Sequence, residues 1–350
     1  MKAKIFTALL VVFSFYFSAN AQVIFTENFA YTAGDSLGAH GWTGFSSFLN
    51  VLTVTSPGLT YTGYPLSGIG NAVTVRTSGQ DAYKDCSEID SIGSVYTALM
   101  VRVDSAKAIG DYFLALLPQT STSFYSPRLF VKDTLSGVCF GISKSSINAT
   151  IVPTWGTTVF SYGTTYLLVL KYKFLTGSTT DDQVSLFVLT APALPLTEPA
   201  TPYVGPITST QTDATSIGRI ALRQGSSSLA SLAVVDGIRI AKLWSNIVSG
   251  VRTISTVADN FNLSQNYPNP FNPSTTINFS IPKDGFVALK VYNALGQEVS
   301  SLLSENLKSG VYSKVFSAVG INSGSYFYRL TFTGIDNTVM TDTKKFMIIK

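Results

Sequence analysis

Short segments rich in β-branched and aromatic residues recur along most of this 350-residue chain, each bounded by Gly, Ser, Asp or Thr. The clearest of them are residues 94–104, 166–174, 183–189 and 238–244. Within 166–174, Lys171 and Lys173 alternate with apolar side chains, a period of two that gives a strand one buried and one wetter face. Outside the first 21 residues no window has the apolar spacing of an amphipathic helix, so the sequence predicts an all-β protein with sheets packed face to face.

Composition and charge exclude several classes of protein. Hydrophobic residues make up 45% of the chain, charged residues make up 13%, and His40 is the one histidine. The chain is therefore too apolar for a disordered protein and too poor in ligands for a typical zinc enzyme. The formal net charge is +4 and no segment concentrates it into a basic stripe, so we expect no nucleic-acid partner.

The first 21 residues have the pattern of a secretory signal peptide. Lys2 and Lys4 precede an apolar run over residues 5–17, and small residues follow as far as Ala21. We expect cleavage between Ala21 and Gln22. The apolar run has 13 residues, fewer than the roughly 20 that a membrane-spanning helix needs, so we expect an exported mature chain without a transmembrane segment.

Export through the periplasm would bring the two cysteines, Cys86 and Cys139, into an oxidising compartment. Both lie beside strand-like runs, where a cysteine also serves as a small apolar residue. The sequence cannot place their Cβ atoms within bonding distance, so it leaves open whether they pair.

Prolines mark the irregular parts of the chain. Five of the 14 lie in residues 192–206, which favours an extended loop, and strand-like runs after it indicate that this loop belongs to the first domain. A small and polar stretch over 249–259 precedes a second proline cluster and is a better boundary. The sequence therefore predicts a signal peptide over 1–21, a first domain over 22–248, a linker over 249–259 and a second domain over 260–350.

The second domain carries a series of specific motifs. They contain Pro268, Asn269, Pro270, Phe271, Tyr292, Gly296, Gly324, Tyr326, Lys344 and Lys345. With these motifs the region resembles the C-terminal sorting domain of the type IX secretion system, which moves proteins across the outer membrane of certain Gram-negative bacteria. The resemblance implies a small immunoglobulin-like sandwich that the outer-membrane machinery reads. It also implies removal by a sortase-like protease, leaving the protein either released or attached to surface lipopolysaccharide.

The first domain is similar to concanavalin A-like (laminin G-like) jelly-roll sandwiches. The similarity is carried by residues 25–29, by His40-Gly41-Trp42, by 166–174 with its partner 182–186, and by the closing 235–240. It implies that the first and last strands of the domain lie side by side. Relatives with this fold bind glycans, cleave them or do neither, so the function has to be argued from a site.

A catalytic site is not expected. Glycan-cleaving jelly rolls of the laminarinase type use the pattern Glu-x-Asp-x-x-Glu, which places three carboxylates in one groove. Glu88 and Asp90 begin this pattern, but Gly93 stands where the third carboxylate belongs, so we interpret the pair as solvated loop residues beside a strand. No Gly-x-Ser-x-Gly motif accompanies His40, which argues against a serine hydrolase.

Two sets of binding residues are candidates. Calcium sites in jelly rolls commonly take oxygen ligands from the opening and closing segments, where this chain has Glu27, Asn28, Asp35 and Asp236. Exposed aromatic rings could stack on sugars. The candidates for such stacking in loop-like surroundings are Tyr61, Tyr64, Tyr125, Trp155 and Tyr162.

The sequence thus predicts a secreted or surface-displayed protein whose first domain is a non-catalytic glycan-binding or adhesion module. Its expected partners are the type IX machinery, the sortase-like protease and a polysaccharide. Two alternatives stay open for the first domain, a divergent glycoside hydrolase and a structural surface protein without a small ligand.

Overall fold

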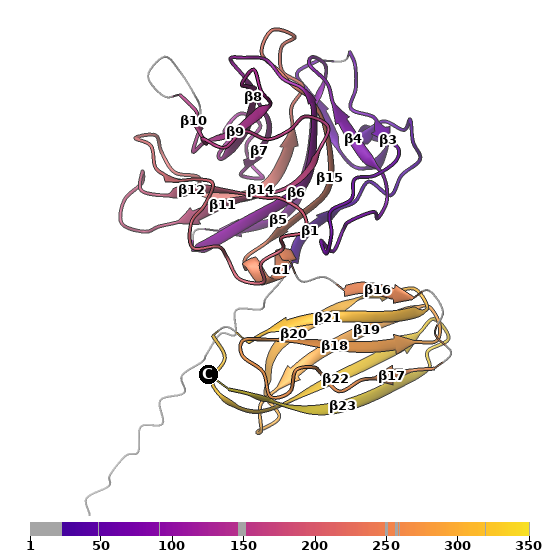
Figure 1. The fold of residues 1–350 in the computed structure, drawn as a ribbon. Helices are drawn as coiled ribbons and strands as arrows, with labels where there is room; N and C mark the ends of the chain where they lie inside the picture. The colour runs from indigo at the N-terminus through magenta and orange to yellow at the C-terminus, as the bar shows by residue number, and fades with distance from the viewer. Residues whose placement is uncertain are drawn as a thin grey trace, which may run out of the picture.

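The computed structural model describes residues 23–47, 49–90, 92–145, 152–248, 251–255, 258, 260–318 and 320–349. Figure 1 shows two separate β-sandwiches, the first running from indigo to salmon along the chain and the second from orange to yellow. The prediction of an all-β chain with a larger sandwich followed by a small one is confirmed. The predicted signal peptide, with Ala21 and Gln22, lies outside the described residues.

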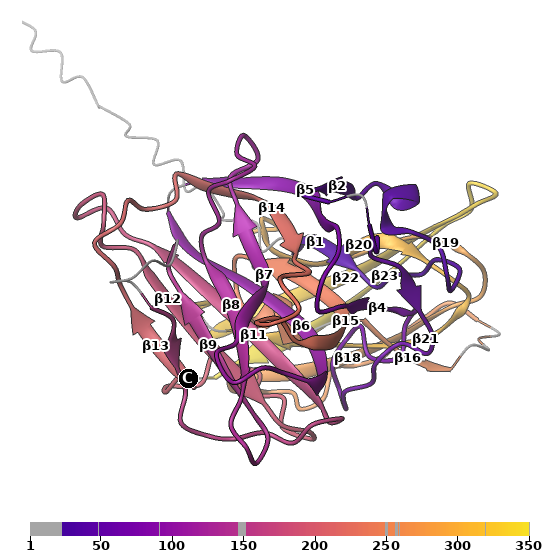
Figure 2. The same ribbon diagram turned by 90° about the horizontal axis from the view of Figure 1, so that it is seen from above.

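The first sandwich consists of an eight-stranded and a seven-stranded sheet. The eight-stranded sheet contains β1 (Val23–Glu27), β3 (Val54–Thr55), β4 (Ala72–Val75), β6 (Gly93–Ser105), β11 (Thr165–Phe174), β12 (Gln183–Leu189), β13 (Val204–Ile207) and β15 (Leu232–Ala241). The seven-stranded sheet has the order β10 (Thr154–Trp155), β9 (Val138–Ser143), β8 (Arg128–Asp133), β7 (Asp111–Leu117), β14 (Ser216–Leu222), β5 (Asp81–Asp90) and β2 (Thr43–Phe45). The first sandwich also contains two short helices, η1 (Leu37–His40) and α1 (Trp244–Val248). Seen from above in Figure 2, the two sheets overlie one another.

The core between the sheets forms because alternate residues of each strand point inward. In β11, Leu168, Leu170 and Tyr172 are fully buried in this core, as the period of two predicts. The predicted wetter face is present only at Lys171 and the exposed Lys173, because Leu167 and Val169 on that face are also fully buried. β11 and β12 form the predicted antiparallel hairpin. β1 pairs with β15, which places the first and last strands of the domain side by side.

A second apolar layer covers the outer face of the eight-stranded sheet. It contains side chains of the loop over residues 57–70, of the sheet and of α1. The proline-rich segment 192–206 lies on this layer, where the Pro195 carbonyl accepts a hydrogen bond of 2.8 Å from Trp244 Nε1. That segment is therefore part of the first domain, as predicted. The last predicted strand is shorter than expected, because β15 ends at Ala241 and Trp244 begins the helix.

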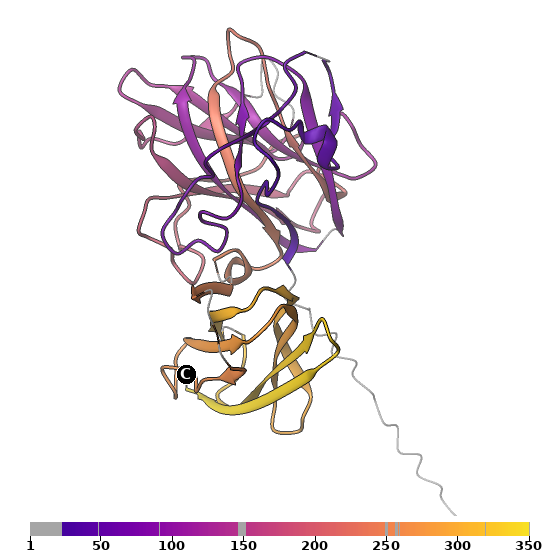
Figure 3. The ribbon, with the colours of Figure 1, turned by 90° about the vertical axis from the view of Figure 1, so that its right-hand side faces the viewer.

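The second sandwich has two four-stranded sheets, seen from another side in Figure 3. One contains β16 (Val251–Ser255), β21 (Gly310–Ser317), β18 (Ser274–Ile281) and β17 (Asn262–Leu263), and the other contains β20 (Glu298–Leu307), β19 (Gly285–Tyr292), β22 (Gly324–Gly334) and β23 (Val339–Ile348). Residues 249–259 were predicted to form a linker throughout. This prediction is wrong for residues 251–255, which form β16 and pair with β21. A short polar stretch can add an edge strand through its backbone alone, which the side-chain pattern does not reveal. Within the described residues no helix is long and apolar enough to span a membrane.

Candidate functional site

Six aromatic rings form a continuous track across the outer face of the seven-stranded sheet. In order they are Tyr83 on β5, Phe45 on β2, Tyr125 in the loop before β8, Tyr112 on β7, Phe130 on β8 and Trp155 on β10. The centroids of successive rings lie 5.5 to 6.4 Å apart. Phe130 is covered, and the other five rings are half-buried, so each presents part of its surface to solvent. We call these six rings the aromatic track.

The strand period explains why the track lies outside the core. In β8, Leu129 and Val131 point into the core between the sheets. Arg128, Phe130 and Lys132 alternate with them and therefore lie on the outer face. No ring of the aromatic track belongs to the buried core clusters of the described residues.

Cationic side chains lie over the rings of the track. The Arg219 guanidinium lies 3.8 Å from the centroid of Tyr83, and Lys132 Nζ lies 4.6 Å from that of Trp155. Tyr112 has two such partners, Arg223 at 4.2 Å and Arg128 at 4.6 Å. The face therefore combines flat apolar rings with hydrogen-bond donors that are held in place by cation–π contacts.

Carboxylates pair with two of these arginines. Arg219 Nε donates to Asp85 at 2.6 Å, and Arg223 Nη1 donates to Asp111 at 2.5 Å. Asp81 is also on this side and accepts a hydrogen bond of 2.8 Å from the Gln224 backbone. Burial raises the pKa of Asp81 and lowers that of Arg128, so the charges are held where water is partly excluded.

Two of the predicted sugar-stacking residues, Tyr125 and Trp155, belong to the aromatic track. Tyr162 is exposed, and its hydroxyl donates to Asp133 at 2.7 Å, but its ring makes no contact with a ring of the track. Phe45, Tyr83, Tyr112 and Phe130 are members of the track that were not predicted from the sequence. The sequence pattern that could have identified them is the alternation of aromatic or charged residues with core residues along the strands of one sheet.

The other two predicted stacking residues, Tyr61 and Tyr64, are not available to a sugar. They are 1% and 3% exposed, because the loop that carries them packs on the outer face of the opposite sheet. Their hydroxyls donate to the Ala193 and Gly237 carbonyls. Both rings are part of the second apolar layer, so their prediction as exposed binding residues is wrong.

Two of the predicted calcium ligands are committed to other contacts. The Glu27 carboxylate accepts hydrogen bonds from Trp42 Nε1, Tyr31 and Lys84 Nζ, the last at 2.6 Å. Asp35 lies 2.9 Å from His40 Nε2. Their carboxylate oxygens are therefore used within the protein and do not form a common site.

Asp236 is also used within the protein, because its Oδ2 accepts a hydrogen bond of 2.7 Å from the Leu59 backbone and its Oδ1 one of 2.6 Å from the Gly237 backbone, although it lies near backbone oxygens. A Cβ atom at Gly58 would lie 2.9 Å from Asp236 Oδ2 and 2.8 Å from the Gly70 carbonyl oxygen, while one at Gly70 would lie 2.0 Å from the Asn28 carbonyl. The opening and closing segments thus meet around two glycines, with an oxygen-rich donor set. Burial raises the pKa of Asp236 to about 7. Calcium at Asp236 and Asn28 stays a prediction.

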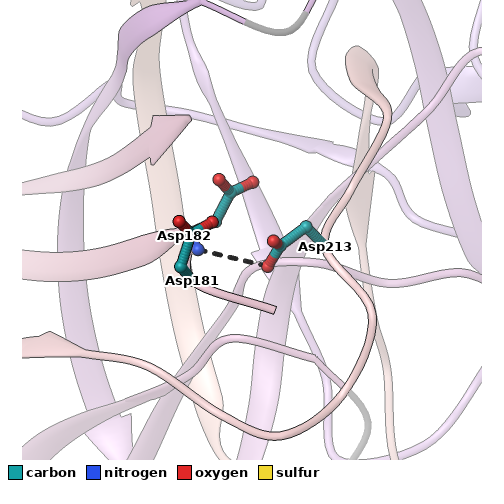
Figure 4. A group of neighbouring side chains, drawn as sticks. All are labelled: Asp181, Asp182 and Asp213. Carbon is teal, nitrogen blue, oxygen red and sulfur yellow. Dashed lines mark hydrogen bonds between the residues drawn. The ribbon is translucent and has the colours of Figure 1, made fainter. Parts of the chain in front are cut away.

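One cluster of three acidic residues forms among the described residues, from Asp181, Asp182 and Asp213 (Figure 4). Their carboxylate oxygens lie within 4.8 Å of one another. The fully buried Lys144 ammonium pairs with Asp213 and donates to the Thr180 carbonyl at 2.9 Å. A protein cation therefore already balances part of this charge, and burial raises the pKa of Asp182. We interpret the cluster as a structural ion pair.

The carboxylates that begin the glycosidase pattern lie in β5, so the prediction that they occupy a loop is wrong. Glu88 is exposed and accepts a hydrogen bond of 2.5 Å from Ser216 Oγ.

The two cysteines are free. β9 and β5, which carry Cys139 and Cys86, are separated by three strands, roughly 19 Å at the usual strand spacing. They therefore cannot pair.

The motif residues of the second sandwich build its structure. Phe271 packs against Phe316 and Phe346, and its backbone pairs with the last strand through Met347 and Ile349. This contact joins the Pro-rich loop of Pro268, Asn269 and Pro270 to the C-terminal end of the chain.

Other motif residues lie at turns and on exposed faces. Gly296 has a φ of 77°, a left-handed conformation that favours glycine in the turn between β19 and β20. Tyr292 lies under Arg329, and Tyr326 stacks on the buried Phe346 with centroids 5.8 Å apart. The remaining motif residues are Gly324 at the start of β22, Lys344, which pairs with Asp342, and the exposed Lys345.

These features define a protein in which a β-sandwich module precedes a small sandwich with a sorting motif. Residues 265–349 match the family described as the secretion system C-terminal sorting domain. The match of this region implies sorting by the type IX secretion system and secretion across the outer membrane. The recognition made from the motifs is thereby confirmed.

The first sandwich has distant structural neighbours. The alginate lyase Aly36B, as a mutant in complex with alginate trisaccharide, is 14% identical over 64% of this chain and 100% of its own, with a TM-score of 0.39. Domain 4 of AbnA, an extracellular arabinanase from Geobacillus stearothermophilus, in complex with arabinotriose, is 12% identical over 65% and 98%, with a TM-score of 0.36. The exoplasmic domain of VIP36 is 8% identical over 49% and 78%, with a TM-score of 0.30. No curated protein matches the chain.

Proposed function

We propose that the first sandwich is a polysaccharide-binding module and that the aromatic track is its binding face. The observation that carries this proposal is the continuity of the track, in which five half-buried rings and the covered Phe130 follow one another across the sheet with successive centroids at most 6.4 Å apart. Sugar rings present apolar C–H faces that stack on flat aromatic side chains, and their hydroxyls need the polar groups beside them. The second sandwich would deliver the module to the cell surface or the medium, after which the sortase-like protease removes it.

Replacing rings of the track is expected to weaken binding without unfolding the protein. Tyr125→Ala and Trp155→Ala should each reduce the affinity for a bound polysaccharide at least about fivefold, since one stacking contact contributes roughly 1 kcal/mol beyond the area it buries. A screen of polysaccharides with calcium present first identifies one that binds. Isothermal titration of the exported chain then measures its affinity. Tyr162→Ala is the matched control, an exposed tyrosine outside the track, and should bind as the unchanged protein does. Equal affinities in all four proteins would contradict the proposal.

The proposed module has no catalytic step. Gly93 occupies the position of the third carboxylate, and Glu88 on β5 accepts a hydrogen bond from Ser216 on the neighbouring β14 of the seven-stranded sheet. We expect no release of reducing sugar from any polysaccharide that binds, and no change in Glu88→Gln. Release that disappears in Glu88→Gln would instead establish a divergent glycoside hydrolase.

A further inference from the structure

The charges along the aromatic track indicate what kind of polysaccharide it takes. Four cations lie over its rings among the described residues, namely Arg128, Lys132, Arg219 and Arg223. Three carboxylates lie with them, namely Asp85 and Asp111, which pair with arginines, and Asp81, on which Arg223 acts electrostatically. Four cations minus three carboxylates leave a net charge of +1 among these groups along the track.

The placement of these carboxylates is unfavourable for a polyanion. The ring centroids from Trp155 on β10 to Phe45 on β2 follow one another in steps of 5.5 to 6.4 Å, so these rings span at most about 24 Å. An extended chain crossing them would still place several sugars on the face. A uronate or sulfated chain would bring a negative charge with each sugar. Asp85 is 46% exposed and would lie next to that chain, and a like charge placed there costs binding energy.

The same pairs suit hydroxyl groups. A hydroxyl both donates and accepts a hydrogen bond, and a paired carboxylate and guanidinium offer an acceptor and a donor side by side. Arg219 is buried, with 8% of its side chain exposed, and is fixed by Asp85 and by the Ser121 carbonyl at 2.7 Å, so it holds the exposed Asp85 carboxylate rigidly beside the Tyr83 ring as an acceptor. The accessible donor is the guanidinium of Arg223, which is 26% exposed and paired with Asp111. Rigid donors and acceptors lose little entropy on binding.

We propose that the aromatic track binds a neutral, hydroxyl-bearing polysaccharide whose chain crosses the strands of the seven-stranded sheet, and that it discriminates against uronate and sulfated chains. This inference rests on the proposed function and adds the chemical class of the ligand. It also explains why the arginines of this face are matched by carboxylates.

The test compares neutral and acidic polymers on the exported chain. The neutral probes are a soluble β-1,4-glucan, a β-1,3-glucan and a galactomannan, and the acidic probes are alginate and polygalacturonate. At least one neutral polymer should bind, with an affinity that changes less than about twofold between 20 and 500 mM NaCl, because screening hardly affects uncharged contacts. Tighter binding of an acidic polymer, lost in Trp155→Ala, would overturn the neutral ligand but leave the track as the binding face. Absence of binding to every polymer would overturn both.

A single substitution should change the specificity. Asp85→Asn removes the exposed carboxylate and raises the net charge of the groups along the track to +2, so we expect affinity for alginate to rise at least about threefold at 20 mM NaCl and to fall again at 500 mM. Asp104→Asn is the matched control, because Asp104 forms a similar surface pair with Arg102 on the other sheet. An unchanged or weaker affinity for alginate in Asp85→Asn would contradict the inference.

Discussion

A chain that lacks residues 251–350 is expected to accumulate in the periplasm, with none at the cell surface or in the medium. The deletion begins at Val251 because β16 pairs within the second sandwich. That sandwich has its own buried core, which includes Phe271, Leu330 and Phe346 and contains no residue of the first. Its removal therefore takes away the region that matches the sorting domain and leaves the core of the first sandwich intact. Cell fractionation with an antibody against the first sandwich measures the outcome.

Two further proteins separate failed sorting from failed folding. The truncated chain in the periplasm should resist protease, since both apolar layers of its sandwich are complete. Residues 251–350 fused to an unrelated periplasmic reporter should carry the reporter across the outer membrane in a host that has the type IX machinery. Export of the truncated chain at the normal level would show that the second sandwich is a spacer.

The largest loss of stability is expected from Lys144→Met. The Lys144 side chain is 0% exposed, pairs with Asp213 and donates to the Thr180 and Ser209 carbonyls. Methionine fills a similar volume but leaves the Asp213 carboxylate, which is only 12% exposed, without its cation, and the loss of one partner of a buried ion pair typically costs about 3–5 kcal/mol. We expect the free energy of unfolding of the first sandwich to fall by this amount.

Chemical denaturation followed by tryptophan fluorescence measures this effect. All three tryptophans of the chain, Trp42, Trp155 and Trp244, lie in the first sandwich, so the signal reports on that domain. Lys173→Met is the control, because Lys173 is exposed on β11 of the same domain and should change stability by less than about 1 kcal/mol. Similar midpoints for the two variants would show that Lys144 contributes no more than a surface lysine.

Much of the fold could be predicted because strand periodicity is local. Alternation along residues 166–174 identified β11 and its buried face, and the polar stretch after it identified the hairpin with β12. The sorting motif was recognisable because its residues are close in sequence and build one compact unit, as the contact between Phe271 and Phe346 shows.

The candidate site could be predicted only in part, because its members come from distant strands. Tyr83 and Tyr125 are 42 positions apart, and both contact Phe45. A loop-like sequence also did not show whether its side chains are exposed to solvent. Tyr61 and Tyr64 lie between turns, yet the loop folds back on a sheet and buries them. Which face of a sheet a loop covers depends on tertiary packing, which local propensity does not encode.

The central claim, that a polysaccharide lies on the aromatic track, is tested most directly by Trp155 fluorescence. Trp42 and Trp244 are 2% and 5% exposed, whereas Trp155 is half-buried on the track, so contact with a sugar should change the emission of Trp155 alone. Adding a polysaccharide that binds should shift or quench the emission of the unchanged protein and leave that of Trp155→Phe constant while binding persists. An equal emission change in Trp155→Phe, or tight binding with no change in the unchanged protein, would place the ligand elsewhere.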